Sequence, residues 1–150
     1  MMRAAGAVVV AVFATATGLV ANAGGPREFL WHYAAIPAVP NHETAIFVGI
    51  ASYCDKELDH TLTDLFAKAK FPDSLYVGLV NQEKKAIRDA PALSRWRHHP
   101  NVRLMEFDPE ESKGAGWARS LIAKMHRGEK YYMQLDSHHL FVRNWDAASV

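Results

Sequence analysis

The residues with the clearest chemical potential are Asp136 and His138, which directly follow an apolar run near the end of the sequence. In an extended backbone, side chains at positions i and i+2 leave from the same face, so this carboxylate and imidazole can converge on one cation while Ser137 and His139 point away. Such a donor pair, with open positions for water or phosphate oxygens, suits Mn²⁺ and accepts Mg²⁺. A surface Asp beside a partly buried His is the competing interpretation.

Other chemistries have less support in the sequence. A metal hydrolase would add His98 and His99 to the Asp136 and His138 pair, but no recognised ligand spacing connects them. The chain contains neither a GxGxxG nor a GxxxxGK[ST] loop, so nothing predicts a dinucleotide or P-loop phosphate site. The single cysteine, Cys54, excludes a disulfide within the chain and a CxxC zinc pattern.

The elements that must position these residues alternate between apolar runs and amphipathic segments. Strands are expected at 45–51, 75–80, 102–107 (with stricter alternation) and 131–135, with a short fifth strand at 139–142. Helices are expected at 58–69, capped by Asp55 and stopped by Pro72, and at 117–125, ended by Gly128. Strands separated by helices imply right-handed crossovers, and hence an α/β fold with a mostly parallel sheet flanked by helices on both faces.

Ligands of such sheets bind at the carboxyl ends of the strands. The polar residues at these ends are Ser52 and Tyr53, Asn81 and Gln82, Asp108, and Asp136. The segment 83–100 is rich in basic residues and histidine, and it is interpreted as a solvated loop with a short helix in preference to a phosphate-facing patch.

Four segments, in this order, resemble the family of polypeptide N-acetylglucosaminyltransferases that includes the enzyme acting on hydroxyproline of a cytosolic ubiquitin-ligase subunit. They are IFVGIASYCD at 46–55, TLTDLFAKAK at 61–70, GWAR at 116–119 and YMQLDSH at 132–138. The chain is more distantly similar to the mucin-type polypeptide N-acetylgalactosaminyltransferases, which share an Arg-ending helix start, an Asp-x-His and a later Trp, here Trp145.

The resemblance implies the nucleotide-binding half of a GT-A fold over residues 45–150. It implies a retaining hexosyltransferase that moves N-acetylglucosamine, or a related sugar, from a UDP-sugar to a polypeptide hydroxyl. Asp136 and His138 would hold Mn²⁺ or Mg²⁺ against the UDP diphosphate, Arg119 would lie near that diphosphate, and Ser52 and Tyr53 would line the nucleotide pocket. No catalytic nucleophile or base is named by the matching segments.

Two departures from the family pattern bear on this expectation. Cys54 stands where the family usually has Arg, which removes a cation near the nucleotide. The family also continues past the position of Val150 into an acceptor-binding half, so the fold is expected to be incomplete, with an exposed edge strand. A catalytically inactive fragment that binds a sugar, a nucleotide or a protein is therefore the alternative function.

The N-terminal region predicts entry into the secretory pathway. Residues 1–23 carry Arg3, an uncharged run and Ala21-Asn22-Ala23, typical of a cleaved signal peptide or, alternatively, an uncleaved membrane anchor. Proline-containing residues 24–44 are expected to form a linker or stem, and a Golgi, ER-lumenal or secreted location follows. The net charge of +1, with 49% hydrophobic residues, fits an ordinary globular domain and indicates no nucleic-acid partner.

Overall fold

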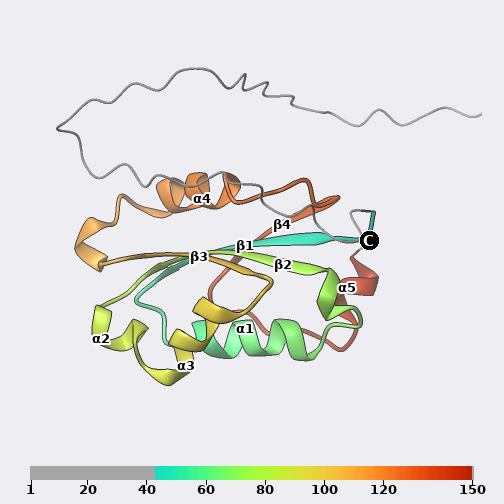
Figure 1. Ribbon diagram of the computed structural model, residues 1–150, viewed down its shortest axis with the longest axis horizontal. Helices are drawn as coiled ribbons and strands as arrows, with labels where there is room; N and C mark the ends of the chain where they lie inside the picture. The colour runs from blue at the N-terminus through green and yellow to red at the C-terminus, as the bar shows by residue number, and fades with distance from the viewer. Residues whose placement is uncertain (1–42, 150) are drawn as a thin grey trace, which may run out of the picture. The chain divides into compact units, whose positions relative to one another are not determined.

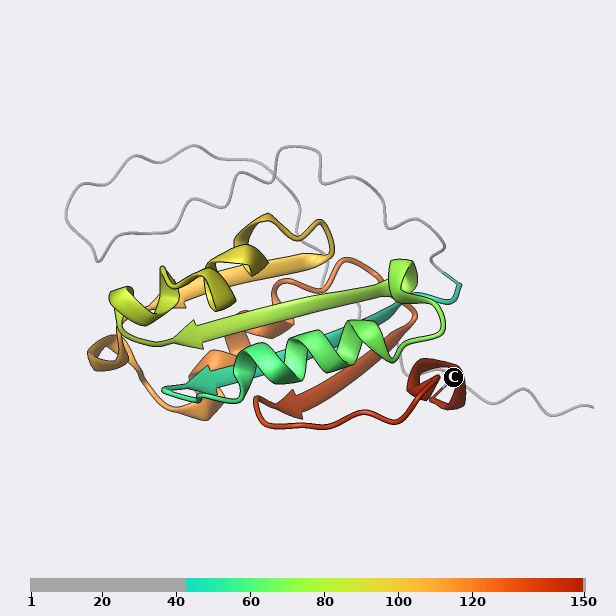
Figure 2. The same ribbon diagram turned by 90° about the horizontal axis from the view of Figure 1, so that it is seen from below.

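A four-stranded parallel sheet forms the centre of the computed structural model, which describes residues 43–149 (Figure 1). Its strands are β1 (Ile46–Tyr53), β2 (Leu75–Gln82), β3 (Val102–Phe107) and β4 (Tyr131–Asp136). They lie in the order β3-β2-β1-β4, and each neighbouring pair is parallel (Figure 2). The α/β fold with a parallel sheet is therefore confirmed, as are the four main strands.

Helices cover both faces of the sheet, as the uniformly apolar central strands require. On one face, Val48 and Ile50 of β1 pack against the apolar stripe of α1 (Leu58–Ala67). On the other face, Phe47 packs against α4 (Ala115–Ala123) through Ile122. Figure 1 shows α4 on one side of the sheet and α1, α2 and α3 on the other. Alternate residues of one strand thus fill two separate cores.

Two glycines in the central strands allow these layers to come close. A Cβ atom at Gly78 would lie 2.3 Å from Phe47 Cζ, and one at Gly49 would lie 2.7 Å from Ile122 Cγ2. Real side-chain atoms do not approach so closely, so the aromatic ring and the helix occupy space that any larger residue would need. These glycines set how closely α4 and Phe47 pack on the sheet.

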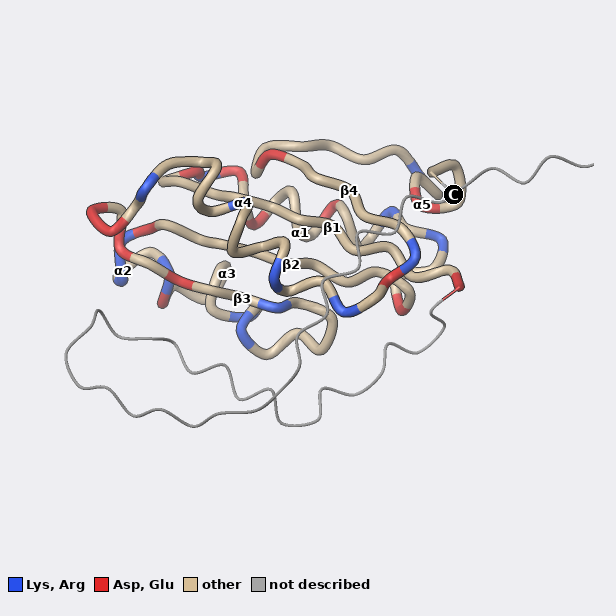
Figure 3. The backbone as a smooth tube through the Cα atoms, turned by 90° about the horizontal axis from the view of Figure 1, so that it is seen from above, with Lys and Arg blue, Asp and Glu red and all other residues tan. Residues whose placement is uncertain are grey.

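The basic segment 83–100 forms short helical turns, in agreement with the solvated-loop interpretation. It contains α2 (Lys85–Arg88), α3 (Pro91–Ser94) and the 3₁₀ turn η2 (Arg95–His98). Four of its cations pair with carboxylates: Lys85 with Asp89, Arg88 with Asp108, Arg95 with Asp59, and Arg97 with Asp89 and Glu106. Figure 3 shows basic and acidic positions interspersed along the chain.

The expected fifth strand at 139–142 is wrong. These residues belong to a segment, 137–144, that runs alongside α1 and is called the strap below. The backbone N–H of Phe141 donates to the Asp64 carboxylate at 2.7 Å, and that of Asn144 donates to the Lys68 carbonyl at the same distance. The strap therefore satisfies its backbone through a helix, and it leads into a short helix, α5 (Trp145–Ala148).

Two smaller expectations also need correction. Helix α4 ends at Ala123, so Gly128, with φ of +92°, serves the turn into β4 and does not cap the helix. All six residues of β3 are half-buried, and the expected alternation is not seen. Two further 3₁₀ turns complete the described elements: η1 (Pro72–Ser74) and η3 (Pro109–Glu111). Pro72, the residue expected to stop the first helix, begins η1.

The N-terminal predictions fall largely outside this structure. The signal or anchor at 1–23 lies outside the described residues, as does the linker at 24–44 except for its last two positions. Among residues 43–149, no helix has the length and apolar character needed to cross a membrane.

Candidate active site

The carboxyl edge of the sheet brings together most of the residues singled out in the sequence. The strand register places Tyr53 beside Gln82 and Ala51 beside Asp136. Because all four strands run in the same direction, the polar residues that follow them share one edge. The predicted site residues are thus divided between a pocket at the ends of β1 and β2 and a charged cluster at the end of β4.

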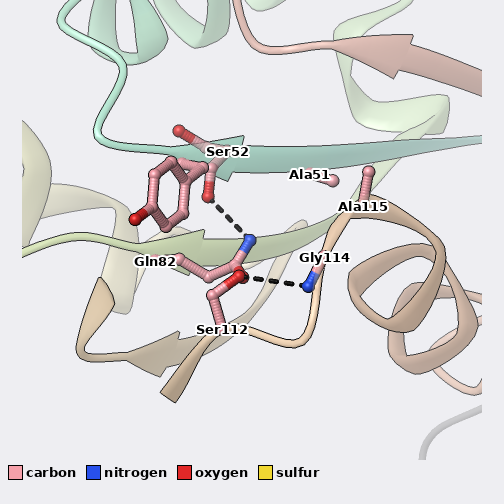
Figure 4. A pocket seen from close by; sticks show the side chains of 7 residues that line it. Ala51, Ser52, Gln82, Ser112, Gly114 and Ala115 are labelled. Atoms are coloured by element: carbon pink, nitrogen blue, oxygen red, sulfur yellow. Dashed lines mark hydrogen bonds between the residues drawn. The ribbon is translucent and has the colours of Figure 1, made fainter. Parts of the chain in front are cut away.

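The pocket is a cavity of about 340 Å³ at this edge (Figure 4). Its lining consists of Ala51, Ser52, Tyr53, Gln82, Ser112, Gly114 and Ala115. Ser52 and Gln82 are almost completely buried, whereas the Tyr53 ring is 58% exposed. The volume lies in the range of small-molecule sites, and an exposed aromatic ring at such a site offers a flat surface for a planar ligand.

Two buried polar atoms of this lining lack partners. The Gln82 side-chain amide donates to the Ser52 carbonyl oxygen at 3.1 Å, which fixes the orientation of the amide group. Gln82 Oε1 and Ser52 Oγ then have no hydrogen-bond partner among the described residues. An unmade bond at a buried polar group costs about 1–3 kcal/mol. A ligand offering both donors and acceptors would recover part of that cost.

The remaining wall of the pocket comes from the start of α4. Gly114 has φ of +88°, which other residues rarely adopt, and its N–H donates to Ser112 Oγ at 3.3 Å. The helix therefore begins at the pocket, and the unpaired N–H groups of a helix start favour anions. Sequence reasoning began this helix at Trp117 and missed these residues. The glycines at 114 and 116, just before the apolar stripe, were the available signal.

In the charged cluster, Asp136 pairs with Arg119 of α4. Arg119 Nη2 lies 3.0 Å from Asp136 Oδ1, and both side chains are about half exposed. The bond uses one carboxylate oxygen and one guanidinium nitrogen. An exposed pair of this kind adds little stability, so both groups can exchange partners at low cost when a ligand arrives.

His138 has a different partner, Asp55, which lies just beyond β1. His138 Nδ1 is 3.0 Å from Asp55 Oδ2, and the Ser137 hydroxyl donates to the same oxygen at 2.5 Å. The other oxygen, Asp55 Oδ1, accepts from the Glu57 backbone N–H at 2.9 Å, in the turn before α1. The prediction that Asp55 caps this helix is wrong, because the N-cap is Glu57 and no side chain caps it. Cys54, with φ of +48°, makes the turn that separates Tyr53 at the pocket from Asp55.

These contacts shift the acid–base properties of the pair. The hydrogen bond from His138 to Asp55 raises the pKa of His138 above its usual value. Burial acts to raise the pKa of Asp55, but the hydrogen bonds from Ser137 and His138 outweigh it, so that pKa falls below its usual value. The two shifts have opposite directions because each charge stabilises the other.

Asp136 and His138, at the end of β4, are the expected metal ligands. Among the described residues, no group of three or more His, Cys, Asp or Glu side chains is positioned to hold a metal ion. Asp136 and His138 supply two donors of types that Mn²⁺ and Mg²⁺ accept, and both are accessible to solvent. The remaining coordination positions would belong to water or to phosphate oxygens.

The two other residues of the hydrolase alternative lie elsewhere. His98 and His99 line a separate cavity of about 350 Å³ together with Phe66, Arg95, Trp96 and Pro100. The His99 ring packs on Phe66 with ring centres 4.4 Å apart. Trp145, part of the more distant resemblance, is buried and donates to the Leu65 carbonyl at 2.9 Å. His98, His99 and Trp145 therefore lie away from the pocket and the charged cluster.

The parallel sheet, its two helical layers and its polar carboxyl edge define an α/β protein whose ligand site is expected at that edge. The sequence model of the family described as Glycosyltransferase (GlcNAc) matches residues 45–99 and 88–150, and the chain belongs to this family. The glycosyltransferase part of the predicted resemblance is thereby confirmed. The narrower polypeptide-acting family stays a prediction.

A solved structure supports the same fold. The crystal structure of S. aureus TarS, residues 1–349, is similar to this chain with a TM-score of 0.55 and 22% identity. The similarity covers 70% of this chain and 31% of that one, so the matched region spans about a third of the TarS chain. No match was found among curated proteins.

Proposed function

We propose that this protein is a metal-dependent glycosyltransferase that transfers N-acetylglucosamine, or a related sugar, from a UDP-sugar to a polypeptide hydroxyl with retention of configuration. The observation that carries the proposal is the position of the Ser52 and Gln82 pocket on the same sheet edge as Arg119, Asp136 and His138. This arrangement offers one region for a nucleotide and another for its diphosphate.

The pocket is the proposed site of the nucleoside. The edge of uracil presents alternating acceptors and a donor, and the unpartnered Ser52 hydroxyl and Gln82 Oε1 offer the complementary groups. The exposed Tyr53 ring can pack on the base. Together, these three residues would bind and orient the donor while excluding water from the base.

The charged cluster is the proposed site of the diphosphate. The Arg119 guanidinium can exchange the Asp136 carboxylate for phosphate oxygens, to which its planar geometry is well suited. Asp136 and His138 would hold Mn²⁺ or Mg²⁺. When bound, such a cation supplies charge stabilisation for the departing UDP. Arg119 adds a fixed positive charge on the same leaving group.

The acceptor and the location are proposed from the sequence. The polypeptide acceptor is supported by the four segments that resemble polypeptide-acting transferases. A secretory location, with Golgi or ER lumen as the site of action, is supported by the signal-like or anchor-like sequence at 1–23. Both stay predictions.

Calorimetric titration of UDP-GlcNAc into the full chain, with and without Mn²⁺, tests the donor site. We expect Mn²⁺-dependent binding that is lost in Asp136→Asn and kept in the control Asp73→Asn, whose carboxylate lies in η1, before β2 and therefore at the other edge. Equal affinity with and without Mn²⁺, or an unchanged affinity in Asp136→Asn, would contradict the proposal. Binding without release of UDP in an activity assay would favour the inactive-fragment alternative.

A further inference from the structure

We infer that Asp55 is a positioning residue that orients the imidazole of His138 for metal binding. The inference rests on the proposed function, because that function assigns His138 to the cation. It gives Asp55 a role beyond the helix cap that its place in the sequence suggests.

The position of Asp55 connects two strands that are neighbours in space. It follows β1, and its carboxylate reaches the residues that follow β4. Oδ2 lies 3.0 Å from His138 Nδ1 and 2.5 Å from Ser137 Oγ, while Oδ1 accepts the Glu57 N–H. The Asp55 side chain is only 18% exposed, so little water competes for these oxygens.

The carboxylate determines which ring nitrogen of His138 can bind a metal ion. An ionised carboxylate only accepts hydrogen bonds, so Nδ1 must carry the hydrogen, and in the neutral ring Nε2 keeps its lone pair. Metal-binding imidazoles are commonly fixed in this way by a carboxylate on the other nitrogen. The His138 side chain is 65% exposed, so packing does little to fix the ring and the Asp55 bond is its principal restraint.

The turn before α1 does not by itself account for this arrangement. The contact in that turn uses only Oδ1, on the Glu57 N–H, whereas Oδ2 is directed at Ser137 and His138. Asparagine at this position has the same shape but only one oxygen that can accept a hydrogen bond. It therefore cannot satisfy both the Glu57 N–H and the donors on Ser137 and His138. The substitution Asp55→Asn thus keeps the shape of the side chain but cannot keep both sets of contacts.

The test is Mn²⁺ binding to the full chain, followed by electron paramagnetic resonance. We expect Asp55→Asn to weaken Mn²⁺ binding by about 10–100-fold, the usual effect of losing such a partner. The matched control is Ser137→Ala, which removes the other donor to the same oxygen and should leave affinity within about twofold if the imidazole contact is what matters. The Mn²⁺–nitrogen coupling from the imidazole should persist in the wild type and in Ser137→Ala, and disappear in Asp55→Asn and His138→Ala.

The outcomes separate this inference from the proposed function. If Asp55→Asn binds Mn²⁺ as the wild type does, with the same nitrogen coupling, the inference is overturned while the metal site stands. If the wild type binds no Mn²⁺, the proposed metal dependence fails, and this role of Asp55 fails with it. An equal loss in Ser137→Ala would mean that the carboxylate only holds the strand end, which also overturns the inference.

A measurement on the wild type covers the case in which Asp55→Asn does not fold. Long-range ¹H–¹⁵N correlation spectra of the metal-free chain, at a pH where the ring is neutral, report the imidazole tautomer. Comparison with His138→Gln assigns the signal. The Nδ1–H tautomer is the expected result, and the Nε2–H tautomer would overturn the inference.

Discussion

The hydroxyl of Thr61, in the middle of α1, donates to the carbonyl oxygen of Ser137 at 2.8 Å, although the two residues are 76 positions apart. The same hydroxyl accepts the His139 backbone N–H at 2.9 Å, and Thr61 is completely buried. One side chain of α1 thus holds the residues on both sides of His138 in place. The geometry of the Asp136-x-His138 pair depends on this helix as much as on β4.

Replacement of Thr61 by Val should destabilise the fold. Thr61→Val keeps the shape but leaves buried backbone groups of Ser137 and His139 unpaired, so we expect a loss of about 1–3 kcal/mol in the free energy of unfolding. The control is Thr63→Val on the exposed side of the same helix, where a change within about 0.5 kcal/mol is expected. Urea unfolding measures both variants, and equal losses would show that the Thr61 bonds are unimportant.

Replacement of Arg119 by Gln should weaken donor binding without affecting stability. Its pair with Asp136 is exposed, so the unfolding midpoint should stay almost unchanged. Loss of a charged hydrogen bond to the diphosphate should weaken UDP binding by about 10-fold or more. Titration calorimetry compares it with Arg143→Gln, a change at an exposed position of the strap. An unchanged UDP affinity in Arg119→Gln would remove this residue from the donor site.

Acid should unfold the protein partly through Glu129, whose side chain is fully buried 2.5 Å from Arg103. Burial acts to raise the pKa of Glu129, but the hydrogen bond from Arg103 outweighs it and leaves that pKa below its usual value. A carboxylate with a lowered pKa stabilises the fold at neutral pH, and this stabilisation is lost as the pH falls through the lowered pKa.

Glu129→Gln should therefore cost about 3–5 kcal/mol at pH 7, since it removes the carboxylate that neutralises the largely buried Arg103. The variant should also lose part of the stability difference between pH 7 and pH 3. Urea unfolding at a series of pH values measures this, with the exposed Glu110→Gln as control. The role of the pair is refuted if both variants show the pH dependence of the wild type.

Replacement of Gly78 by Ala should show how tightly the central strands are packed. The new methyl group would meet the ring of Phe47 at 2.3 Å, so a loss of about 1–3 kcal/mol is expected from overpacking. Gly116→Ala is the control, because nothing lies within 4 Å of a Cβ there and alanine favours a helix. Thermal unfolding should separate the two variants, and a neutral Gly78→Ala would mean that Phe47 moves freely.

The sequence predicted the parts of the fold that depend on local patterns. The apolar runs at 45–51 and 75–80 are buried strands because both faces of the sheet are covered. The run at 139–142 failed because its apolar residues do not mark a buried element: Leu140 and Val142 are each 74% exposed. Its backbone bonds to α1 could not be read from periodicity.

The candidate site likewise combines residues that a local pattern predicts with partners that it does not. Asp136 and His138 could be proposed from the sequence because they follow a strand and lie two residues apart. Their partners come from distant segments, with Asp55 separated from His138 by 83 positions. The pocket lining at Ser112 and Gly114 depends on where a loop crosses the ends of β1 and β2. Such pairings are set by topology and leave no local pattern.

The position of β1 between β2 and β4 has a consequence for synthesis of the protein. One edge of β1 has no strand to pair with until Tyr131 and the residues of β4 have been made. At about 5–20 residues per second, the interval from Tyr53 to Tyr131 lasts roughly 4–16 s on the ribosome. During this time one edge of β1 stays unpaired, and the site, which includes Asp136 and His138, is among the last features to form.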